Sequence, residues 1–390
     1  MPSALDGIRV LDFGRIQQGP FAGVLLSDMG ADVIKIEEPG GEARQGADER
    51  GFSGMYEANN RGKRSITVNL RDEAGREVIR RLIPSTDVVL ENFRPGRMEA
   101  WGIGYEDLKK IRGDLIFASA SGWGRRGPWG TRGGYDHVAQ AFSGVMSEQG
   151  GGSARTPQAL IGGFADSIGA MMLAYGIVTA LVARERTGVG QHVDVSLIGA
   201  MLALQQRPLT IYFGTGVQPG FEYRRSATYT HYECRDGLYV ALAANTQAMW
   251  ERFCVAVERP DMAADARFKG PFDRARHKDE LVAALEALFV TRDQSDWMER
   301  LAAHDVPYGP VLDYPAVAEH PQFLENGYVQ EIDHPVFGRM KTVGPPVHMS
   351  ATPSRIQGAP PQVGQHTEEI LLTLGYGWPE ITALRDGGAI

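Results

Sequence analysis

Short apolar runs alternate with longer amphipathic segments along the first half of the chain. The runs, bounded by turn residues, predict strands at 8–13, 32–37, 65–70, 87–92 and 115–121. Apolar residues at helical spacing predict helices at 19–29, near 73–82 and near 105–111. Strands that alternate with helices are typical of an α/β fold with a doubly wound, mostly parallel sheet. Such sheets bind ligands at the carboxyl ends of their strands.

A long apolar stretch, "GGFADSIGAMMLAYGIVTAL" (162–181), predicts a core helix with a lone acid, Asp166, at its start. Asp166 suits a helix N-cap, because its side chain accepts hydrogen bonds from free N–H groups of the first turn. It also suits a nucleophile or base that the helix N-terminus keeps ionised. The apolar run 168–183 is short for a membrane span. The residues alone leave both interpretations of Asp166 open.

The pattern changes near residue 220. Two alternating runs flank Arg235-Asp236-Gly237 in "YTHYECRDGLYVALAA", which predicts a β-hairpin. Helical spacing follows at 249–257, 278–288 and 296–304, and "GQHTEEILLTLG" predicts a short helix near the C-terminus. We therefore expect a large domain at 1–224, a small α+β domain at 225–325, and a C-terminal segment at 326–390.

Composition narrows the class of protein. The 390 residues are 43% hydrophobic and 23% charged, which is ordinary for a globular protein. The net charge of −8 argues against a nucleic-acid partner or an anionic membrane surface. Cys234 and Cys254 are the only cysteines, and the N-terminus shows no signal peptide, so we expect a cytoplasmic protein.

Several common catalytic motifs are absent from the sequence. The first strand is followed by "GRIQQG" rather than G-x-G-x-x-G, and no G-x-x-x-x-G-K-[ST], G-x-S-x-G or H-E-x-x-H occurs. The nine histidines lack metal-ligand spacing. We expect no metal site, no permanently bound cofactor, and none of the local signatures of NAD, ATP, serine hydrolysis or zinc.

Longer blocks of sequence carry more information. In order, they are "LDGIRVLDFGRIQQGPFAGVLLSDMGADVIKIEEPGG", "NRGKRSITVNL", "VVLENFRPG", "GGYDHVAQAFSG", "ADSIGAMMLAYGIVTALVARERTGVGQHVDVSL", "DVPYGPVLDYPAVAEHPQFLENGYV" and "PPQVGQHTEEILL". Together they resemble the family III CoA-transferases of the formyl-CoA transferase and carnitine CoA-transferase type. The resemblance implies that segments 1–224 and 326–390 build one Rossmann-like domain, and that ring-shaped subunits interlock in a homodimer.

The resemblance also implies a reaction. Asp166 falls on the family's catalytic aspartate, which would attack an acyl-CoA thioester and form first an aspartyl–acyl anhydride and then an aspartyl-CoA thioester. The acceptor carboxylic acid would then take up CoA by the reverse steps, so acyl-CoA and acid are the expected substrates. Gln17 matches a family glutamine whose amide can donate to an oxyanion. Whether Gln17 or Gln18 points inward stays open.

Tyr135 separates this interpretation from a rival one. The α-methylacyl-CoA racemases resemble the chain but carry a histidine at the position of Tyr135, and tyrosine is a poor base near neutral pH. A racemase-like acid/base enzyme is therefore the alternative, followed by a CoA-binding protein without activity. As a structural residue, Tyr135 would be a packed aromatic side chain with a satisfied hydroxyl group.

CoA binding is expected near the strand ends. The positions that match family contacts, or lie beside them, are Val68, Arg71, Asn92, Phe93, Arg94, Arg97 and Arg132. Some family members have arginine where this chain has Glu38 and Ala100, and we expect Arg94, Arg97 or Arg132 to take their place.

Two further features bear on the acid substrate. The region "FEYRRSATYTHYECRDG" lacks the glycine run that forms an active-site flap in formyl-CoA transferase, which makes oxalate specificity less expected. Arg224 and Arg225 would either bind a second carboxylate of the acceptor acid or lie on the surface.

Overall fold

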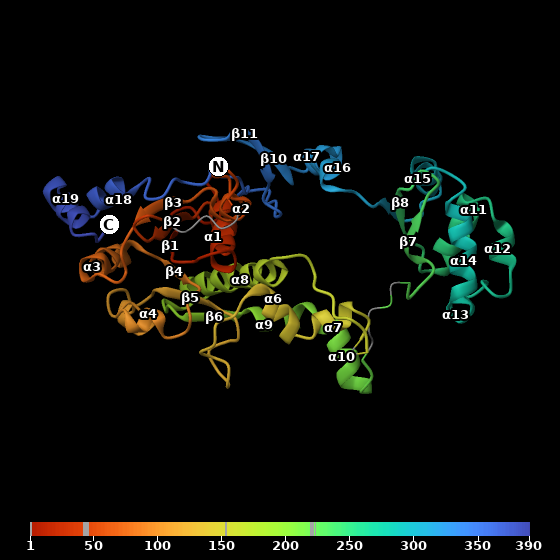
Figure 1. The fold of residues 1–390 in the computed structure, drawn as a ribbon, viewed down its shortest axis with the longest axis horizontal. Helices are drawn as coiled ribbons and strands as arrows, with labels where there is room; N and C mark the ends of the chain where they lie inside the picture. Colours follow the sequence, from red (N-terminus) through yellow and green to blue (C-terminus); the bar gives the residue numbers. More distant parts are fainter. Residues whose placement is uncertain (1, 42–46, 153, 219–221, 223) are drawn as a thin grey trace. The chain divides into compact units, whose positions relative to one another are not determined.

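The structure is a computed structural model that describes residues 2–41, 47–152, 154–218, 222 and 224–390 (Figure 1). Contacts divide the chain into two units. Unit 1 comprises Met1–Pro219 and Pro321–Ile390, and unit 2 comprises Gly220–His320.

A six-stranded sheet forms the centre of unit 1. Its order is β3-β2-β1-β4-β5-β6, and every neighbouring pair is parallel. The strands are β1 (Arg9–Asp12), β2 (Asp32–Glu37), β3 (Arg64–Thr67), β4 (Val88–Glu91), β5 (Ile116–Ser121) and β6 (His192–Ser196). The order reverses at β1, which pairs with β2 on one side and β4 on the other. The predicted α/β fold with a parallel sheet is therefore confirmed.

The two faces of the sheet carry separate apolar cores, because successive side chains of a strand point to opposite faces. Val10 and Val88 belong to a cluster with α1 (Gln18–Asp28) and α8 (Phe164–Thr187). Leu11 and Val89 belong to the other cluster, with α3 (Glu73–Leu82), α18 (Thr367–Thr373) and α19 (Trp378–Asp386). The C-terminal helices thus pack on the same face of the sheet as α3, and α1 packs on the other face.

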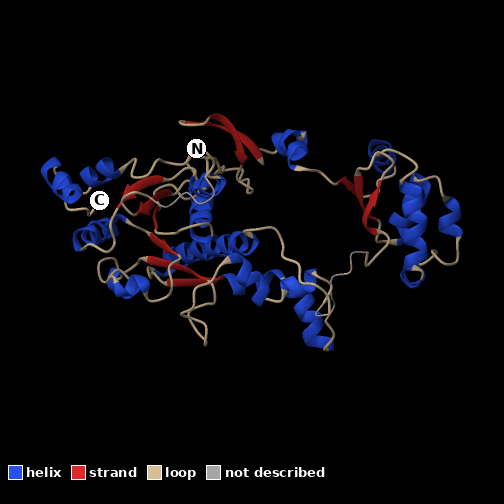
Figure 2. Cartoon of the chain, in the orientation of Figure 1, coloured by secondary structure: helices blue, strands red, loops and turns tan. Residues whose placement is uncertain are grey.

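Other elements of unit 1 surround this frame (Figure 2). They are α2 (Gly54–Asn60), η1 (Ile83–Ser85), α4 (Arg97–Ala100), α5 (Tyr105–Leu108), α6 (Asp136–Phe142), α7 (Val145–Gln149), α9 (Leu197–Leu204), α10 (Gln206–Thr215), α17 (Pro321–Glu325) and the antiparallel hairpin of β10 (Val329–His334) and β11 (Gly338–Val343).

Unit 2 contains an antiparallel three-stranded sheet and a set of helices. The predicted hairpin is confirmed, since β7 (Tyr229–Glu233) pairs with β8 (Tyr239–Ala243), and β9 (Tyr308–Pro310) adds the third strand. The helices are α11 (Gln247–Ala256), α12 (Pro260–Ala264), α13 (Pro271–Arg276), α14 (Lys278–Phe289), α15 (Gln294–Ala303) and α16 (Tyr314–Glu319). Trp250, Phe253, Phe289 and Trp297, from α11, α14 and α15, are buried in one core.

One predicted strand is shorter than expected. The apolar pattern 65–70 predicts a strand to Leu70, but β3 ends at Thr67. The N–H group of Asn69 donates to the carbonyl of Ala389, far along the chain, instead of continuing the ladder with β2.

Candidate active site

A pocket of about 390 Å³ opens at the carboxyl ends of β1, β4 and β5. It lies where the strand order reverses, which is the usual ligand site of a doubly wound sheet. Four short segments and two helix starts line it, with the residues Arg15, Ile16, Gln17, Gln18, Asn92, Phe93, Arg94, Pro95, Ala120, Ser121, Gly122, Arg132, Gly133, Gly134, Tyr135, Asp166 and Leu197.

The loops after β1 and β4 are tied together. The N–H group of Arg15 donates to Oδ1 of Asn92, and Nδ2 of Asn92 donates to the carbonyl of Arg15, both at 2.8 Å. Ile16, which follows, has a positive φ of 67°, which is strained for a β-branched residue. Strain of this kind is held only where surrounding contacts fix the backbone, and here they fix one wall of the pocket.

Asp166 lies in the first turn of α8, but it is not the N-cap that the sequence suggested. The helix begins at Phe164, and Gly163 takes the N-cap position with a φ of 76°. Asp136 supplies the capping carboxylate from α6, and its Oδ1 accepts from the N–H groups of Ala165 at 2.6 Å and Asp166 at 3.2 Å. The side chain of Asp166 is therefore not needed for capping and is available to the pocket.

The electrostatics of Asp166 also differ from expectation. Burial, and secondly the charge of Asp136, raise its pKa from 3.8 to about 7. The sequence predicted that the helix N-terminus would keep this carboxylate ionised. Burial, the larger cause, and Asp136, which occupies two of the N–H groups and adds a second negative charge, both oppose that effect.

Gln17 is bound to the start of α8. Its Nε2 donates to the carbonyl of Gly163 at 3.0 Å and to Oγ of Ser167 at 2.8 Å. The carbonyl of Gly163 only accepts, which fixes the orientation of the amide. Both amide hydrogens of Gln17 are thus used to hold the helix turn that carries Asp166.

The side-chain amide of Gln18, unlike that of Gln17, has no acceptor for its Nε2 among the described residues. Its side chain lines the same pocket and is packed against Gly169, three residues after Asp166 on α8. The residue is only 4% exposed, and its Nε2 has no hydrogen-bond partner in the part of the chain that the structure describes. A buried donor without an acceptor costs free energy, so Gln18 is the unsatisfied amide of this site.

Tyr135 lines the pocket directly before α6, with its side chain 65% exposed. It is not the packed aromatic residue of the structural interpretation. His137, two residues later, does not belong to the pocket lining. The structure therefore brings Tyr135, and not His137, to the pocket, and its match to the histidine position of the racemases stays a prediction.

The structure brings Asn92, Phe93, Arg94 and Arg132 of the predicted CoA-binding set into this pocket. Val68, Arg71 and Arg97 do not line it. Val68 is fully buried in the core, Arg71 is exposed beyond the edge strand β3, and the guanidinium of Arg97 lies over Trp101 at 4.4 Å. A role of these residues in CoA binding stays a prediction.

Arg15 is a residue that sequence reasoning missed. Its guanidinium pairs with Glu38 at 2.8 Å, lies 5.3 Å from the ring of Phe93, and lines the pocket. The signal that could have found it is Glu38, the position at which the resemblance implies an arginine in some family members. Three arginines, Arg15, Arg94 and Arg132, therefore surround the pocket and suit phosphate oxygens.

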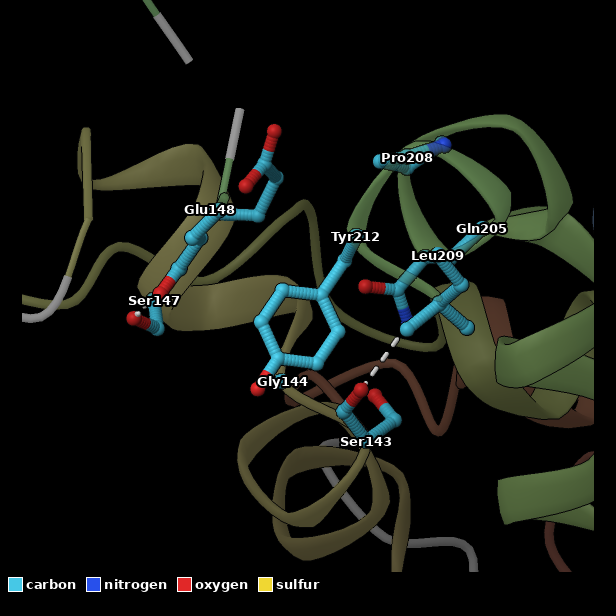
Figure 3. Close-up of a pocket in the computed structure, with 9 residues that line it drawn as sticks. Ser143, Gly144, Ser147, Glu148, Gln205, Pro208, Leu209 and Tyr212 are labelled. Carbon is cyan, nitrogen blue, oxygen red and sulfur yellow. Dashed lines mark hydrogen bonds between the residues drawn. The ribbon is translucent and has the colours of Figure 1, made fainter. Parts of the chain in front are cut away.

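A second pocket of about 260 Å³ lies between α6, α7 and α10 (Figure 3). Nε2 of Gln205 donates to the carbonyl of Ser143 at its floor, and Tyr212 stands in its opening. No arginine or lysine is among its described lining residues, so it does not suit a phosphate-bearing ligand. In the described part of the chain, no group of three or more His, Cys, Asp and Glu side chains forms a metal site.

Comparison with known proteins gives a consistent result. The family model described as CoA-transferase family III matches residues 5–367. The chain is 32% identical to a succinyl-CoA:glutarate CoA-transferase of Homo sapiens, over 94% of this chain and 85% of the relative. It is 34% identical to a formyl-CoA:oxalate CoA-transferase of Rhodopseudomonas palustris, over 100% and 98%.

A solved structure matches as well. A CAIB/BAIF family protein from Brucella suis superposes with a TM-score of 0.86 and 32% sequence identity, covering 96% of this chain and 100% of that one.

Proposed function

Because the chain belongs to CoA-transferase family III, we propose that Asp166 is the nucleophile with which it transfers CoA between an acyl-CoA and a carboxylic acid. One observation carries the proposal. The partly buried carboxylate of Asp166 shares a pocket at the switch point of the sheet with three arginines, Tyr135 and both glutamines. That pocket offers a nucleophile beside a site for a polyanionic ligand.

The first half of the reaction forms two covalent intermediates. The ionised Asp166 attacks the thioester carbonyl, the C–S bond breaks, and CoA leaves as the thiolate, which leaves an aspartyl–acyl anhydride. The thiolate then attacks the carbonyl carbon of Asp166, the C–O bond of the anhydride breaks, and the donor acid leaves as its carboxylate. Asp166 is now a CoA thioester.

The second half reverses these steps. The acceptor carboxylate attacks the aspartyl-CoA thioester and expels the thiolate, which gives a new mixed anhydride. The thiolate attacks the acceptor's acyl carbon, and Asp166 leaves as a free carboxylate. No proton is consumed, and no metal or other cofactor takes part in any step, so acyl-CoA and acid are the only reactants.

Gln17 supports this cycle through the helix. Its two donated hydrogen bonds hold the first turn of α8, which fixes the backbone of Asp166 relative to the loop after β1. In this state it has no hydrogen left for an oxyanion, so Gln17 is a positioning residue. Arg15, Arg94 and Arg132 bind phosphate groups of CoA at the pocket rim.

The pKa of about 7 also suits an acid/base role for Asp166, as in a racemase, so the experiment must separate the two. The enzyme is incubated with succinyl-CoA, digested and examined by mass spectrometry for a CoA adduct on the peptide that contains Asp166. We expect the adduct in the wild type, and a loss of transfer activity of at least about 10³-fold in Asp166→Asn.

Glu185→Gln, an exposed carboxylate on the same helix, is the matched control and keeps both adduct and activity. Full transfer by Asp166→Asn, with no adduct in the wild type, contradicts the proposal. Exchange of the substrate α-hydrogen in D₂O without an acceptor acid supports the racemase instead.

We also propose that the chain acts as a homodimer. Met171, Tyr175, Val178 and Val182 form an exposed apolar stripe along α8, at spacings that place them on one side of the helix. In the adjoining part of unit 1, α10 buries none of its residues, and Phe213 is 76% exposed. A second copy of the chain would cover these exposed apolar side chains, because contiguous apolar patches mark interaction sites.

A further inference from the structure

A third pocket, of about 190 Å³, lies entirely within unit 2. Three cationic side chains line it, those of Arg225, Arg274 and Lys278. Ser226, Thr228 and Asn245 add hydroxyl and amide groups, and none of the described lining residues is acidic. A concave site that gathers cations and neutral donors, without carboxylates, has the chemistry of an anion site.

Arg274 is the built-in part of this pocket. The residue is 6% exposed, and its Nη1 donates to Oε1 of Gln247 and to the carbonyl of Phe268, both at 3.0 Å. The guanidinium lies 5.1 Å from the ring of Trp250. Among the described residues, no carboxylate forms an ion pair with it. A buried charge that lacks a counter-ion is costly, and a bound anion would supply one.

The sequence left open whether Arg224 and Arg225 bind a ligand or lie on the surface, and only Arg225 lines the pocket. Arg224 is paired with Glu286 and lies 5.4 Å from the ring of Tyr232, outside the pocket lining. Arg225 is exposed, lines the pocket, and has no ion-pair partner among the residues described. Of the two neighbouring arginines, only Arg225 is placed to meet a ligand.

Lys278, the first residue of α14, is the third cationic residue that lines the pocket. Its ammonium group pairs with Glu222 and lies 3.6 Å from Asp279, both on the exposed side. An ammonium group has three donors, so Lys278 can keep a surface partner and still donate into the pocket.

We propose that this pocket binds a small oxyanion, a carboxylate or phosphate group, between Arg225, Arg274 and Lys278. Pockets for drug-sized ligands hold about 300–1,000 Å³, so this one suits a small acid or a single phosphate rather than a whole CoA molecule. The two guanidinium groups can each bind two oxygens of such a group, and the hydroxyl groups of Ser226 and Thr228 can donate to others.

The test is titration calorimetry on the full chain at low salt, with glutarate and inorganic phosphate as separate probes. We expect the wild type to bind at least one of them, and Arg225→Gln and Lys278→Gln each to weaken that binding about tenfold. Arg276→Gln is the matched control, because Arg276 is exposed on α13, has the same charge and does not line the pocket. It should bind like the wild type.

Several results would overturn the proposal. One is that the wild type binds neither probe. Another is that Arg225→Gln, Lys278→Gln and Arg276→Gln bind the probe with equal affinity. The probe that binds more tightly identifies the source of the oxyanion, an acid or a phosphate.

Asp166→Asn keeps this proposal separate from the proposed function. The variant should keep anion binding while losing CoA transfer. Loss of binding in Asp166→Asn alone would place the anion in the unit 1 pocket and overturn the site in unit 2.

Discussion

A carboxyl group with a pKa of about 7, such as that of Asp166, is ionised in about half of the molecules at neutral pH. Because only the ionised carboxylate can attack, the raised pKa lowers the fraction of molecules with an active nucleophile. The raised pKa also makes the ionised carboxylate more basic, and catalytic groups work best with a pKa near the working pH. Burial is the larger cause of the raised pKa, and Asp136 adds to it, because one carboxylate both caps α8 and repels the charge of its neighbour.

The pH dependence of the reaction should respond to Asp136. In Asp136→Asn, the amide oxygen can still accept from the N–H group of Ala165, but the negative charge is gone. We expect the pKa of Asp166 to fall, so that the acid limb of the kcat/KM–pH profile moves to lower pH by about one unit. Glu185→Gln should leave the limb in place. An unmoved limb in Asp136→Asn would show that the charge of Asp136 does not reach the nucleophile.

The raised pKa of Asp166 also makes a prediction about stability. The folded state holds a proton on Asp166 up to about pH 7, whereas an unfolded aspartate loses it near its model value of 3.8. The unfolded state binds fewer protons between these values, so this group's stabilising contribution is lost as the pH rises from about 4 to about 7.

Asp166→Asn removes this titration. We expect the variant to have a higher Tm than the wild type at pH 8, with the difference shrinking towards pH 4. Thermal unfolding across this range measures the effect. A Tm difference that is constant with pH would argue that Asp166 titrates normally.

The sequence could identify Asp166 only through the family resemblance, since its local pattern equally suited a cap. It could not identify Asp136 or Arg15, and it could not decide between Gln17 and Gln18, because these roles depend on contacts between separate segments. The loop after β1 meets the loop after β4, and α6 meets the start of α8, only in the folded chain. Lone residues in such loops carry no periodic signal.

At the scale of elements, α8 shows how a helix end can serve the site. Both of its ends carry glycine with positive φ, Gly163 at 76° and Gly188 at 70°. A Cβ at Gly188 would meet no atom within 4 Å, whereas a Cβ at Gly163 would come within 2.5 Å of Oε1 of Gln17. The first glycine therefore has a packing role that the second lacks.

Alanine at these two positions should separate backbone strain from site geometry. Gly188→Ala should lower the free energy of unfolding by about 1–2 kcal/mol with unchanged activity, because only the left-handed backbone is penalised. Gly163→Ala should cost more stability and lower transfer activity at least about tenfold, since the amide of Gln17 must move. Denaturant unfolding and steady-state rates on both variants measure the two effects. Equal activities would exclude the role given to Gln17.

The strands of the sheet were the most predictable elements. β2 and β5 are almost wholly buried, as expected for a covered parallel sheet, although their sequences DVIKIE and IFASAS mix apolar with charged or hydroxyl side chains. The hairpin of β10 and β11 was not predicted, because most of its side chains are polar or partly exposed and no apolar face marks its register. α10 was missed for a related reason, since it buries no residue of its own.

At the scale of the whole molecule, contacts between distant segments complete unit 1. The N–H group of Ser65 on β3 donates to Nδ1 of His366, 301 residues away. Ile370 and Ile381 enter the same core as Ile34 and Val89. Local periodicity predicts the C-terminal helix but not the segment against which it packs. Only the family resemblance predicts that the C-terminal and N-terminal segments build one domain.

The exposed stripe on α8 has two physical explanations at this scale. Phe164–Thr187 is the one described helix that is long and apolar enough to cross a membrane, with a mean hydropathy of 1.6 and 39% of the window buried. Its other side packs in the core with Ala170, Leu173 and Ile177, against β5 and β6. A helix fixed to a sheet in this way cannot be surrounded by lipid, so a second copy of the chain fits the stripe better.

An introduced charge distinguishes these cases. Val178→Glu places a carboxylate in the middle of the stripe, where a partner would have to bury it without a counter-ion, so we expect the dimer to dissociate into monomers. Val255→Glu on α11 is the matched control, because Val255 is also an exposed valine but belongs to α11 of unit 2 and not to the stripe. Sedimentation velocity at micromolar concentration should show a dimer for the wild type and Val255→Glu, and a monomer for Val178→Glu. A monomeric wild type, or a wild type that floats with phospholipid vesicles while Val178→Glu does not, would contradict the homodimer and return α8 to the membrane interpretation.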